Sequence, residues 1–355
     1  EPAPIAPRHR RAEHSHGSHR WIVDGVASAV ERSADTLSMF SEQPVAWAAA
    51  AGGGATSVEL AVTGRVVATY ELAPHLEPVL APRPFLHPVR SLGGAVTSDC
   101  QPPDHPWHLG VGVAIQDVGG VNCWGGRTYD RHHGYLWRDD HGTVRHVEWV
   151  QRSAGLIGHT LAWMGPDHQC RLVEERTITA QPVGGATDRW VLGFRFALRN
   201  VSGRPLALGS PGSNGRVGGG YGGFFWRLAR AAGRREVCTD RAVGEQAVHG
   251  QVAPWVAWTQ HGREPAGPGD GAFTLMVAPA DGQTAADPWF VRLADYPGIG
   301  SALAWDEPVV LAPGEIAARS VRALVVDGTG HDLGDLYDQL ARATTSTNSD
   351  GQDHR

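Results

Sequence analysis

The sequence predicts an all-β protein built mainly from antiparallel strands, and three observations support this fold class. From Trp21 to about Val326, short segments alternate between apolar and polar residues, which is the two-residue period of a half-buried strand. Turn-forming residues separate these segments, and the 355 residues include 46 glycines and 24 prolines. Helical patterns are scarce and no repeat of fixed length is present, which leaves a large sandwich or a closed barrel as the architecture.

Several strands can be assigned in order along the chain. The stretch "VELAVTGRVVATYEL" predicts two strands joined in a hairpin at Thr63 and Gly64. The same alternation recurs in four later segments: "RLVEERTITAQPV" (171–183), "RWVLGFRFALRN" (189–200), "FTLMVAPADG" (273–282) and "ARSVRALVVDG" (318–328).

One helix is predicted near the C-terminus, in "HDLGDLYDQLARA" (331–343), because its apolar residues recur on one helical face: Leu333, Leu336, Tyr337 and Leu340. The segment 27–40 fits a helix or a strand with a loop equally well. We therefore expect a disordered tail at 1–19, a single β-sandwich domain at 20–328, a helix within 329–343 and a disordered tail at 344–355. The glycine-rich stretch 209–223 is interpreted as a loop of the functional site, because strand patterns resume on both sides of it.

Composition and charge exclude several classes of function. The net charge is −6, so a nucleic-acid partner is not expected. The sequence contains no lysine, which excludes Schiff-base chemistry and a phosphate-binding P-loop. No run of 18 apolar residues is present, so no membrane partner is expected, and the N-terminal residues lack the apolar stretch of a signal peptide.

The four cysteines are widely spaced and fit no zinc-binding pattern: Cys100, Cys123, Cys170 and Cys238. Free or buried thiols are the preferred interpretation, and they favour a reducing, cytoplasmic location.

Histidine and arginine concentrate between residues 87 and 146, around the sequence "DHPWH". Pro103 and Pro106 exclude a regular helix there, so this segment is expected to be a loop. Asp104, His105 and His108 fit a two-histidine, one-carboxylate metal site, completed by His87 or His133. In this alternative a divalent metal is the cofactor; the preferred interpretation requires none.

Thirteen tryptophans point toward a sugar ligand, because aromatic faces stack on the C–H surfaces of sugars while polar groups bind the hydroxyls. The alternative is that tryptophans fill a large core. The tryptophans beside polar residues or glycine are the candidates: Trp107, Trp124, Trp137, Trp226, Trp255, Trp258, Trp289 and Trp305.

Glu174 is a candidate base. In the strand pattern Glu174 and Arg176 share one face, and an inward arginine would keep the carboxylate ionised. Paired with His108 or His133, Glu174 would supply acid and base groups. The alternative is an exposed charge pair on an edge strand.

The segment "GYGGFFWR" (220–227) brings glycines beside Trp226 and Arg227, whereas the motifs of serine hydrolases, NTPases and dinucleotide-binding enzymes are absent. Four segments resemble the PmoA family of bacterial proteins: "RPFLHPVRSLGG", "DHPWHLGVGVAIQDVGGVNCWGGRTY", "HHGYLWRDDHG" and "GYGGFFWR". The resemblance covers residues 83–327. It implies a fold similar to the galactose-mutarotase supersandwich and sugar recognition on a concave sheet face.

The resemblance also implies functional roles for a set of residues: His87, Arg90, Asp104, His105, Trp107 and His108, with Trp124, Gly125 and Gly126 behind them. The family name refers to methane oxygenase, but a membrane oxygenase subunit needs spanning helices, which this sequence does not predict.

The sequence thus predicts a carbohydrate-processing protein of the epimerase, lyase or hydrolase type, with a small carbohydrate as its partner. His105, His108 and Glu174 are the predicted catalytic residues. The predicted substrate-binding residues are His87, Arg90, Asp104, Trp107, Trp124, His133, Trp226 and Arg227. Two alternatives remain open: a non-catalytic carbohydrate-binding protein, and a metal-dependent oxygenase or hydrolase centred on Asp104, His105 and His108.

Overall fold

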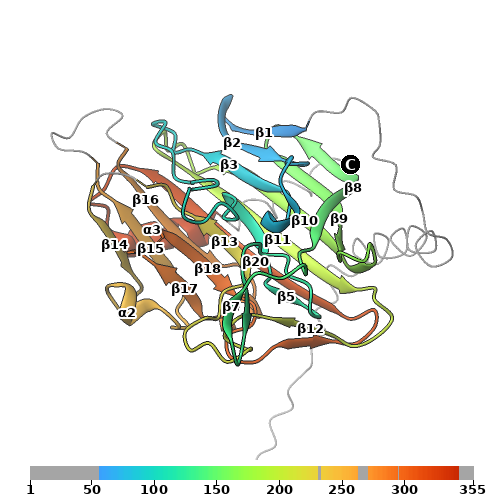
Figure 1. The fold of residues 1–355 in the computed structure, drawn as a ribbon. Coiled ribbons are helices and arrows are strands. Elements are labelled where there is room, and N and C mark those ends of the chain that lie inside the picture. The colour runs from blue at the N-terminus through green and yellow to red at the C-terminus, as the bar shows by residue number, and fades with distance from the viewer. Residues whose placement is uncertain (1–55, 231–232, 263–270, 295, 344–355) are drawn as a thin grey trace, which may run out of the picture. The chain divides into compact units, whose positions relative to one another are not determined.

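The computed structural model describes residues 56–230, 233–262, 271–294 and 296–343 (Figure 1). All of them belong to the unit Ala55–Arg355. The two predicted tails, 1–19 and 344–355, and the ambiguous segment 27–40 lie outside the described residues.

The larger of two main sheets has eight strands, and every described neighbour in it is antiparallel. Its long central strands correspond to the alternating segments that the sequence shows most clearly. In spatial order the strands are β14 (Arg235–Cys238), β15 (Val256–Gln260), β16 (Phe273–Pro279), β20 (Ile316–Asp327), β11 (Arg189–Asn200), β10 (Cys170–Pro182), β9 (Leu156–Met164) and β8 (Thr143–Ser153).

The second main sheet has seven strands, again with antiparallel neighbours. It begins with the predicted hairpin, whose turn places Thr63 and Gly64 at positive φ. In spatial order the strands are β1 (Ser57–Val62), β2 (Arg65–Glu71), β3 (Phe85–Val89), β4 (Val111–Ala114), β13 (Gly223–Arg227), β18 (Gly298–Ala302) and β17 (Trp289–Arg292).

The remaining elements are short. A three-stranded sheet contains β19 (Val309–Leu311), β12 (Leu206–Gly209) and β5 (Asp117–Val118), and a hairpin contains β6 (Thr128–Asp130) and β7 (Gly134–Leu136). The helical elements are η1 (Pro78–Leu80), α2 (Glu245–Val248), η2 (Thr284–Ala286) and α3 (Leu333–Arg342).

The two main sheets enclose one apolar core. On β11, Leu192, Phe194 and Phe196 point into it and are buried, as the two-residue period requires. Phe194 meets Phe224 of β13, from the opposite sheet, with ring centroids 5.3 Å apart. This contact between facing strands makes the architecture a sandwich.

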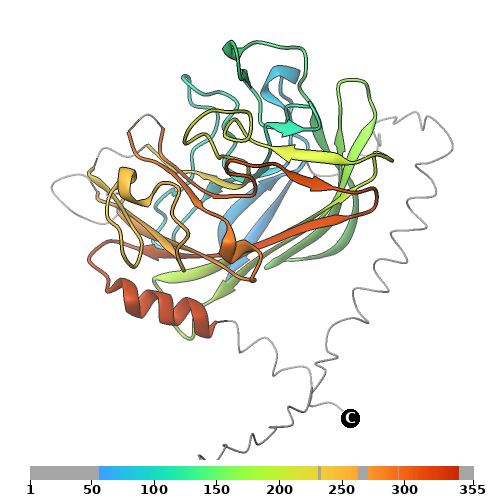
Figure 2. The same ribbon diagram turned by 90° about the horizontal axis from the view of Figure 1, so that it is seen from below.

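Helix α3 covers the outer face of the eight-stranded sheet (Figure 2). Leu336 and Leu340 are buried against Val191 of β11 and neighbouring strands, and Asp332 caps the helix by accepting a hydrogen bond from the Asp335 N–H. The predicted fold class is therefore confirmed: an all-β, antiparallel sandwich with a short C-terminal helix.

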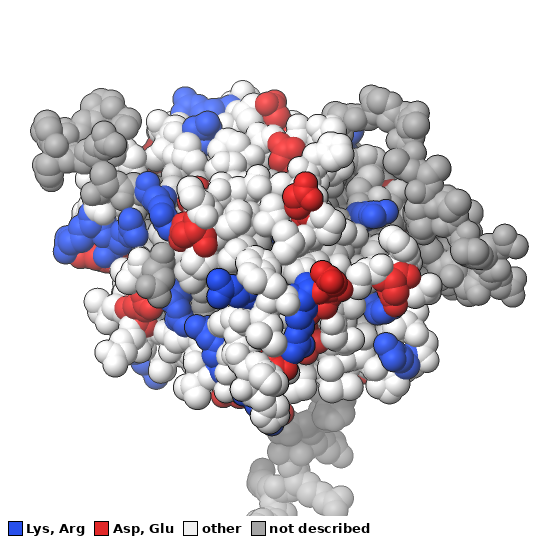
Figure 3. All heavy atoms as spheres, viewed as in Figure 1, with Lys and Arg blue, Asp and Glu red and all other residues white. Residues whose placement is uncertain are grey.

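Three further sequence-based expectations can be compared with the structure. All four cysteines are free thiols. Within the described ranges, no helix combines the length and apolar character needed to cross a membrane. On the face shown in Figure 3, arginine and acidic side chains are both present over the described surface.

Candidate ligand-binding site

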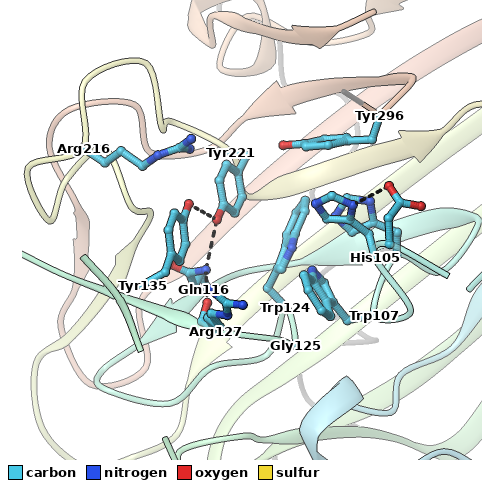
Figure 4. A pocket seen from close by; sticks show the side chains of 12 residues that line it. His105, Trp107, Gln116, Trp124, Gly125, Arg127, Tyr135, Arg216, Tyr221 and Tyr296 are labelled. Atoms are coloured by element: carbon cyan, nitrogen blue, oxygen red, sulfur yellow. Dashed lines mark hydrogen bonds and ion pairs between the residues drawn. The ribbon is translucent and has the colours of Figure 1, made fainter. Parts of the chain in front are cut away.

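A pocket of about 310 Å³ lies over the outer face of the seven-stranded sheet. Alternation along β13 explains this position, because neighbouring residues face opposite sides. Phe224 and Trp226 point into the main core, whereas Phe225 joins a separate aromatic cluster with Trp124 and Tyr221. The pocket is built on that second cluster, from loops that lie far apart in the sequence (Figure 4).

One end of the pocket is formed by the "DHPWH" loop between β3 and β4. The His105 N–H donates to the Pro102 carbonyl at 3.0 Å, and the His108 N–H donates to the His105 carbonyl at 2.9 Å. These successive turns replace the helix that the prolines exclude. They bring the two imidazole rings into a stack with centroids 4.8 Å apart.

Asp104 orients the first of these imidazoles. Its Oδ2 lies 2.8 Å from His105 Nδ1 and 2.6 Å from an Nη2 of Arg230. Burial opposes ionisation of Asp104, but the His105 hydrogen bond and the Arg230 charge outweigh it and lower the pKa of the carboxyl group. The ionised Asp104 can only accept, so Nδ1 of His105 carries the hydrogen of this bond, and in the neutral imidazole the lone pair is on Nε2.

His108 is almost completely buried, and its Nδ1 has no hydrogen-bond partner. Burial, followed by the nearby His105, Arg227 and Arg83, holds the pKa of His108 well below its usual value. His108 is therefore neutral at physiological pH.

Trp107 forms one wall of the pocket and packs against a glycine pair. A Cβ atom at Gly126 would lie 2.5 Å from two ring carbons of Trp107, and one at Gly125 would lie 2.7 Å from the Trp107 Cβ. Arg83 fixes the loop from behind by donating from Nη2 to the Trp107 carbonyl at 2.9 Å. The two glycines thus allow the indole to lie directly on the backbone.

Asn122 shapes the turn that carries these glycines. Its Oδ1 accepts from the N–H groups of Trp124 and Gly125, both at 2.9 Å, and its Nδ2 donates to Gly126 and Thr128. Trp124 is thereby held at the base of the pocket, where its ring lies 4.6 Å from that of Tyr221. Tyr296, from the β17–β18 connection, packs with its ring centroid 4.8 Å from each of those of His105 and His108, tilted against the first and edge-on to the second.

The opposite end of the pocket contains tyrosines, an amide and two arginines. Gln116 Nε2 donates to the Tyr221 hydroxyl at 3.0 Å, and the hydroxyls of Tyr221 and Tyr135 lie 2.9 Å apart. Burial raises the pKa of both phenols, and it raises the pKa of Tyr296 to about 12. All three tyrosines therefore remain protonated at neutral pH and can donate hydrogen bonds.

Arg127 and Arg216 complete this end of the pocket. Arg127 follows the Asn122 turn, and Arg216 belongs to the glycine-rich β12–β13 loop. That loop is tied down at the Gly218 carbonyl, which accepts from Arg292 Nη2 at 3.2 Å and lies 3.0 Å from His249 Nε2. The glycine-rich loop thus lies beside the pocket, to which it contributes Arg216 and Tyr221.

The pocket brings together six of the residues that the sequence singled out: Asp104, His105, Trp107, His108, Trp124 and Gly125. Among the other tryptophans considered, Trp226, Trp258 and Trp289 are buried in the main core. Core filling therefore applies to these three tryptophans, whereas Trp107 and Trp124 line the pocket.

Six predicted residues do not line the pocket. His87 Nδ1 pairs with Ser98 Oγ at 2.9 Å, Arg90 is exposed, and His133 is an exposed partner of Asp130. Trp226 faces the core, whereas Arg227 lies behind the pocket with its guanidinium 5.7 Å from the Tyr296 ring.

Glu174 is the sixth of these residues, and it lies inside the sandwich. Its side chain and that of Arg176 are fully buried, and Arg176 Nε donates to Glu174 Oε1 at 2.6 Å. The predicted inward pairing with Arg176 is present. Trp163 Nε1 donates a hydrogen bond to the second carboxylate oxygen, Oε2, at 2.8 Å. The Glu174 carboxylate is therefore surrounded by hydrogen-bond donors of the protein.

Six residues of the pocket were not assigned a role from the sequence: Gln116, Arg127, Tyr135, Arg216, Tyr221 and Tyr296. The available signals were indirect, namely the arginine cluster around residue 127 and the glycine-rich loop that contains Arg216 and Tyr221. Within the described part of the chain, no group of three or more His, Cys, Asp or Glu side chains is arranged to hold a metal ion.

The fold and the site define an all-β sandwich protein with a pocket that combines aromatic walls, a His–Asp pair and arginines. Residues 57–336 match the model of a family of unknown function (DUF6807), and the chain belongs to that family. No curated protein matches the sequence. Among solved structures, the chain is similar to a galactose mutarotase related enzyme from Lactobacillus acidophilus, with 10% identity, a TM-score of 0.30 and coverage of 52% of this chain and 73% of that chain.

Proposed function

We propose that the protein processes a carbohydrate, a sugar or modified glycoside, by acid–base chemistry at His105. The observation that carries this proposal is the Asp104–His105 pair at one end of an aromatic-walled pocket (Figure 4). The same proposal includes a relationship to the PmoA family and a cytoplasmic location.

The pocket suits a sugar in size and in chemistry. Its volume of about 310 Å³ is at the lower end of the range of about 300–1,000 Å³ that is typical of small-molecule sites. Trp107 and Trp124 offer apolar faces, while Gln116 and the tyrosine hydroxyls offer hydrogen bonds. A sugar ring presents the matching combination of C–H surfaces and hydroxyl groups.

His105 is the residue that can move a proton. With Nδ1–H donated to Asp104, Nε2 accepts a proton from a sugar hydroxyl or from an activated C–H group, and it can return that proton to another position. The Asp104 carboxylate stabilises the resulting imidazolium, as a carboxylate does in other His–Asp pairs. His108, held neutral against the same ring, adds no competing positive charge.

The test compares His105→Gln and Asp104→Asn with the unchanged protein. Binding and turnover of a panel of aldoses and methyl glycosides are measured by ¹H NMR, through line broadening of the sugar signals and through their conversion or exchange with deuterated water. We expect His105→Gln to bind the sugar and to lower turnover by about 100-fold or more. Trp107→Ala is expected to weaken binding instead.

His261→Gln is the matched control, because His261 also lies beside a carboxylate, Glu236 at 3.4 Å, but does not line the pocket. Sugar binding without any turnover by the unchanged protein would identify a non-catalytic carbohydrate-binding protein. If no sugar binds, the proposed function is wrong.

A further inference from the structure

The two arginines of the pocket have unused hydrogen-bonding capacity. Within the described residues, neither the Arg127 nor the Arg216 guanidinium makes a hydrogen bond or an ion pair. Each lies over an aromatic ring: the Arg127 Cζ is 5.7 Å from the Trp137 centroid, and the Arg216 Cζ is 5.2 Å from the Tyr135 centroid. Ring stacking uses the faces of a guanidinium and leaves its N–H groups in the plane free to bind a carboxylate or phosphate.

Among the described residues that line the pocket, no acidic side chain lies at the end that holds these two arginines. The one acid that lines the pocket is Asp104, which is already shared between His105 and Arg230. Arg227 lies behind Tyr296, where its guanidinium pairs with Asp99 at 3.6 Å. A pocket lined by charge of one sign with low-dielectric walls concentrates ligands of the opposite sign, so this pocket favours an anion.

The positive charge and the proton-transfer group lie at opposite ends. Figure 4 shows Arg127, Arg216, Tyr135 and Gln116 on one side of Trp124, and His105 with Tyr296 on the other. A ligand that reaches both ends must therefore combine an anionic group with a separate polar part over the indole.

We propose that the ligand is an anionic sugar, whose carboxylate or phosphate binds between Arg127 and Arg216 while its ring extends over Trp124 toward His105. This inference rests on the proposed function and specifies its substrate class. The anionic group then serves as an anchor, and the carbon acted on by His105 lies at the other end of the sugar. The chain contains no lysine, so arginine is the cation that can perform this role.

The experiment measures dissociation constants by titration calorimetry for matched probes. D-glucuronate and D-galacturonate carry a carboxylate, D-glucose 6-phosphate carries a phosphate, and D-glucose and D-galactose are their neutral counterparts. Malonate tests an anion without a sugar ring. We expect at least one anionic sugar to bind about tenfold or more tightly than its neutral counterpart, with an advantage that shrinks as salt concentration rises.

Variants of the two pocket arginines test whether these residues cause the preference for an anionic sugar. Arg216→Gln and Arg127→Gln are each expected to reduce the affinity for the anionic sugar about tenfold and to leave the affinity for the neutral sugar unchanged. Arg216→Lys keeps the charge but loses the planar fork, so an intermediate affinity is expected. Arg138→Gln is the control, because Arg138 pairs with Asp130 outside this pocket.

The outcomes separate the two proposals. Equal affinities for neutral and anionic sugars, or equal losses for both in Arg216→Gln, overturn the anionic substrate and leave the sugar function standing. Binding of malonate without any sugar shows an anion site and overturns the sugar function together with this substrate class. An absence of binding by every probe overturns both proposals.

Discussion

Trp107 owes its position to two residues that lack a side chain. Gly125 and Gly126 adopt φ values of +97° and +70°, a left-handed conformation that glycine adopts without steric cost. The indole lies so close to Gly126 that a methyl group there would overlap its ring carbons. The "WGG" sequence is therefore part of the pocket wall, although neither glycine binds a ligand through a side chain.

Replacing Gly126 by alanine is expected to displace the Trp107 ring and to weaken sugar binding by about tenfold. The same change raises the energy of the backbone by about 1–2 kcal/mol, because of the positive φ. Gly203→Ala is the matched control, since Gly203 has a φ of +74° and no atom within 4 Å of an added Cβ. Chemical denaturation measures the backbone cost in both variants, and calorimetry measures binding. Equal affinities in the two variants would contradict the assigned role of the glycine.

The histidine end of the pocket could be predicted from the sequence because its determinants are local. Pro103 and Pro106 exclude a helix, and five consecutive residues supply the carboxylate, the imidazoles and an indole. The arginine end could not be predicted in this way. Three pocket residues lie more than 75 residues from His105 along the chain: Arg216, Tyr221 and Tyr296. They reach the pocket because of how the loops pack and how the strands are ordered, and a single sequence does not specify either of these.

At the scale of elements, the positions and the two-residue period of the strands could be predicted from the sequence. Which sheet carries the site, and on which of its two faces, could not. Glu174 and Arg176 share a face of β10, as expected, but β10 belongs to the eight-stranded sheet and that face meets the core. The pocket lies on the outer face of the other sheet. Alternation alone cannot distinguish these two faces, because both are lined by buried residues.

The turn 122–126 is the element that positions the aromatic base of the pocket. Asn122 is fully buried and its amide makes four hydrogen bonds, two to backbone N–H groups, one to a carbonyl and one to a hydroxyl. Loss of that amide leaves the N–H groups of Trp124 and Gly125 without partners inside the protein. Such unsatisfied groups cost about 1–3 kcal/mol each.

Asn122→Ala is therefore expected to lower the free energy of unfolding by about 2–4 kcal/mol and also to weaken ligand binding through movement of Trp124. Asn200 provides the comparison, because it is equally buried and its amide organises the β11–β12 turn through a similar set of hydrogen bonds. Asn200→Ala should match the loss of stability and leave the dissociation constant unchanged. A similar loss of affinity in both variants would show that general destabilisation, and not the turn, is responsible.

At the scale of the whole molecule, a buried polar network joins the two main sheets. Arg176 of β10 donates to the Tyr70 hydroxyl of β2 at 2.9 Å and to the Pro84 carbonyl at 3.1 Å. The same hydroxyl lies 3.0 Å from Nε2 of His159, on β9. Each of these polar groups has a hydrogen-bond partner in another, and burying any of them without a partner would be costly. The stability of the sandwich therefore depends on the protonation state of His159.

Burial, reinforced by the charge of Arg176 and by His146, lowers the pKa of His159 to about 2 from the usual 6.5. Between these two values the unfolded chain binds a proton that the folded protein does not. Stability therefore rises with pH across this window, and it falls as the pH decreases below about 6.5. Asp104 and Asp188, whose pKa values are lowered, titrate at lower pH, whereas burial raises the pKa of Asp287. The contribution of His159 is therefore obtained as a difference in slope between a His159 variant and the unchanged protein, because Asp287 is present in both.

The free energy of unfolding, measured with denaturant at intervals between pH 7.5 and 5, is expected to fall below pH 6.5 by about 1.4 kcal/mol per pH unit for each proton that folding excludes. His159→Gln removes one such proton, so its slope in this interval should be smaller by about that amount. His75→Gln serves as control because His75 is exposed, and its slope should equal that of the unchanged protein. If the slope of His159→Gln also stays unchanged, His159 already carries a proton in the folded sandwich, and the network must accommodate a charge between Tyr70 and His146 that its burial disfavours.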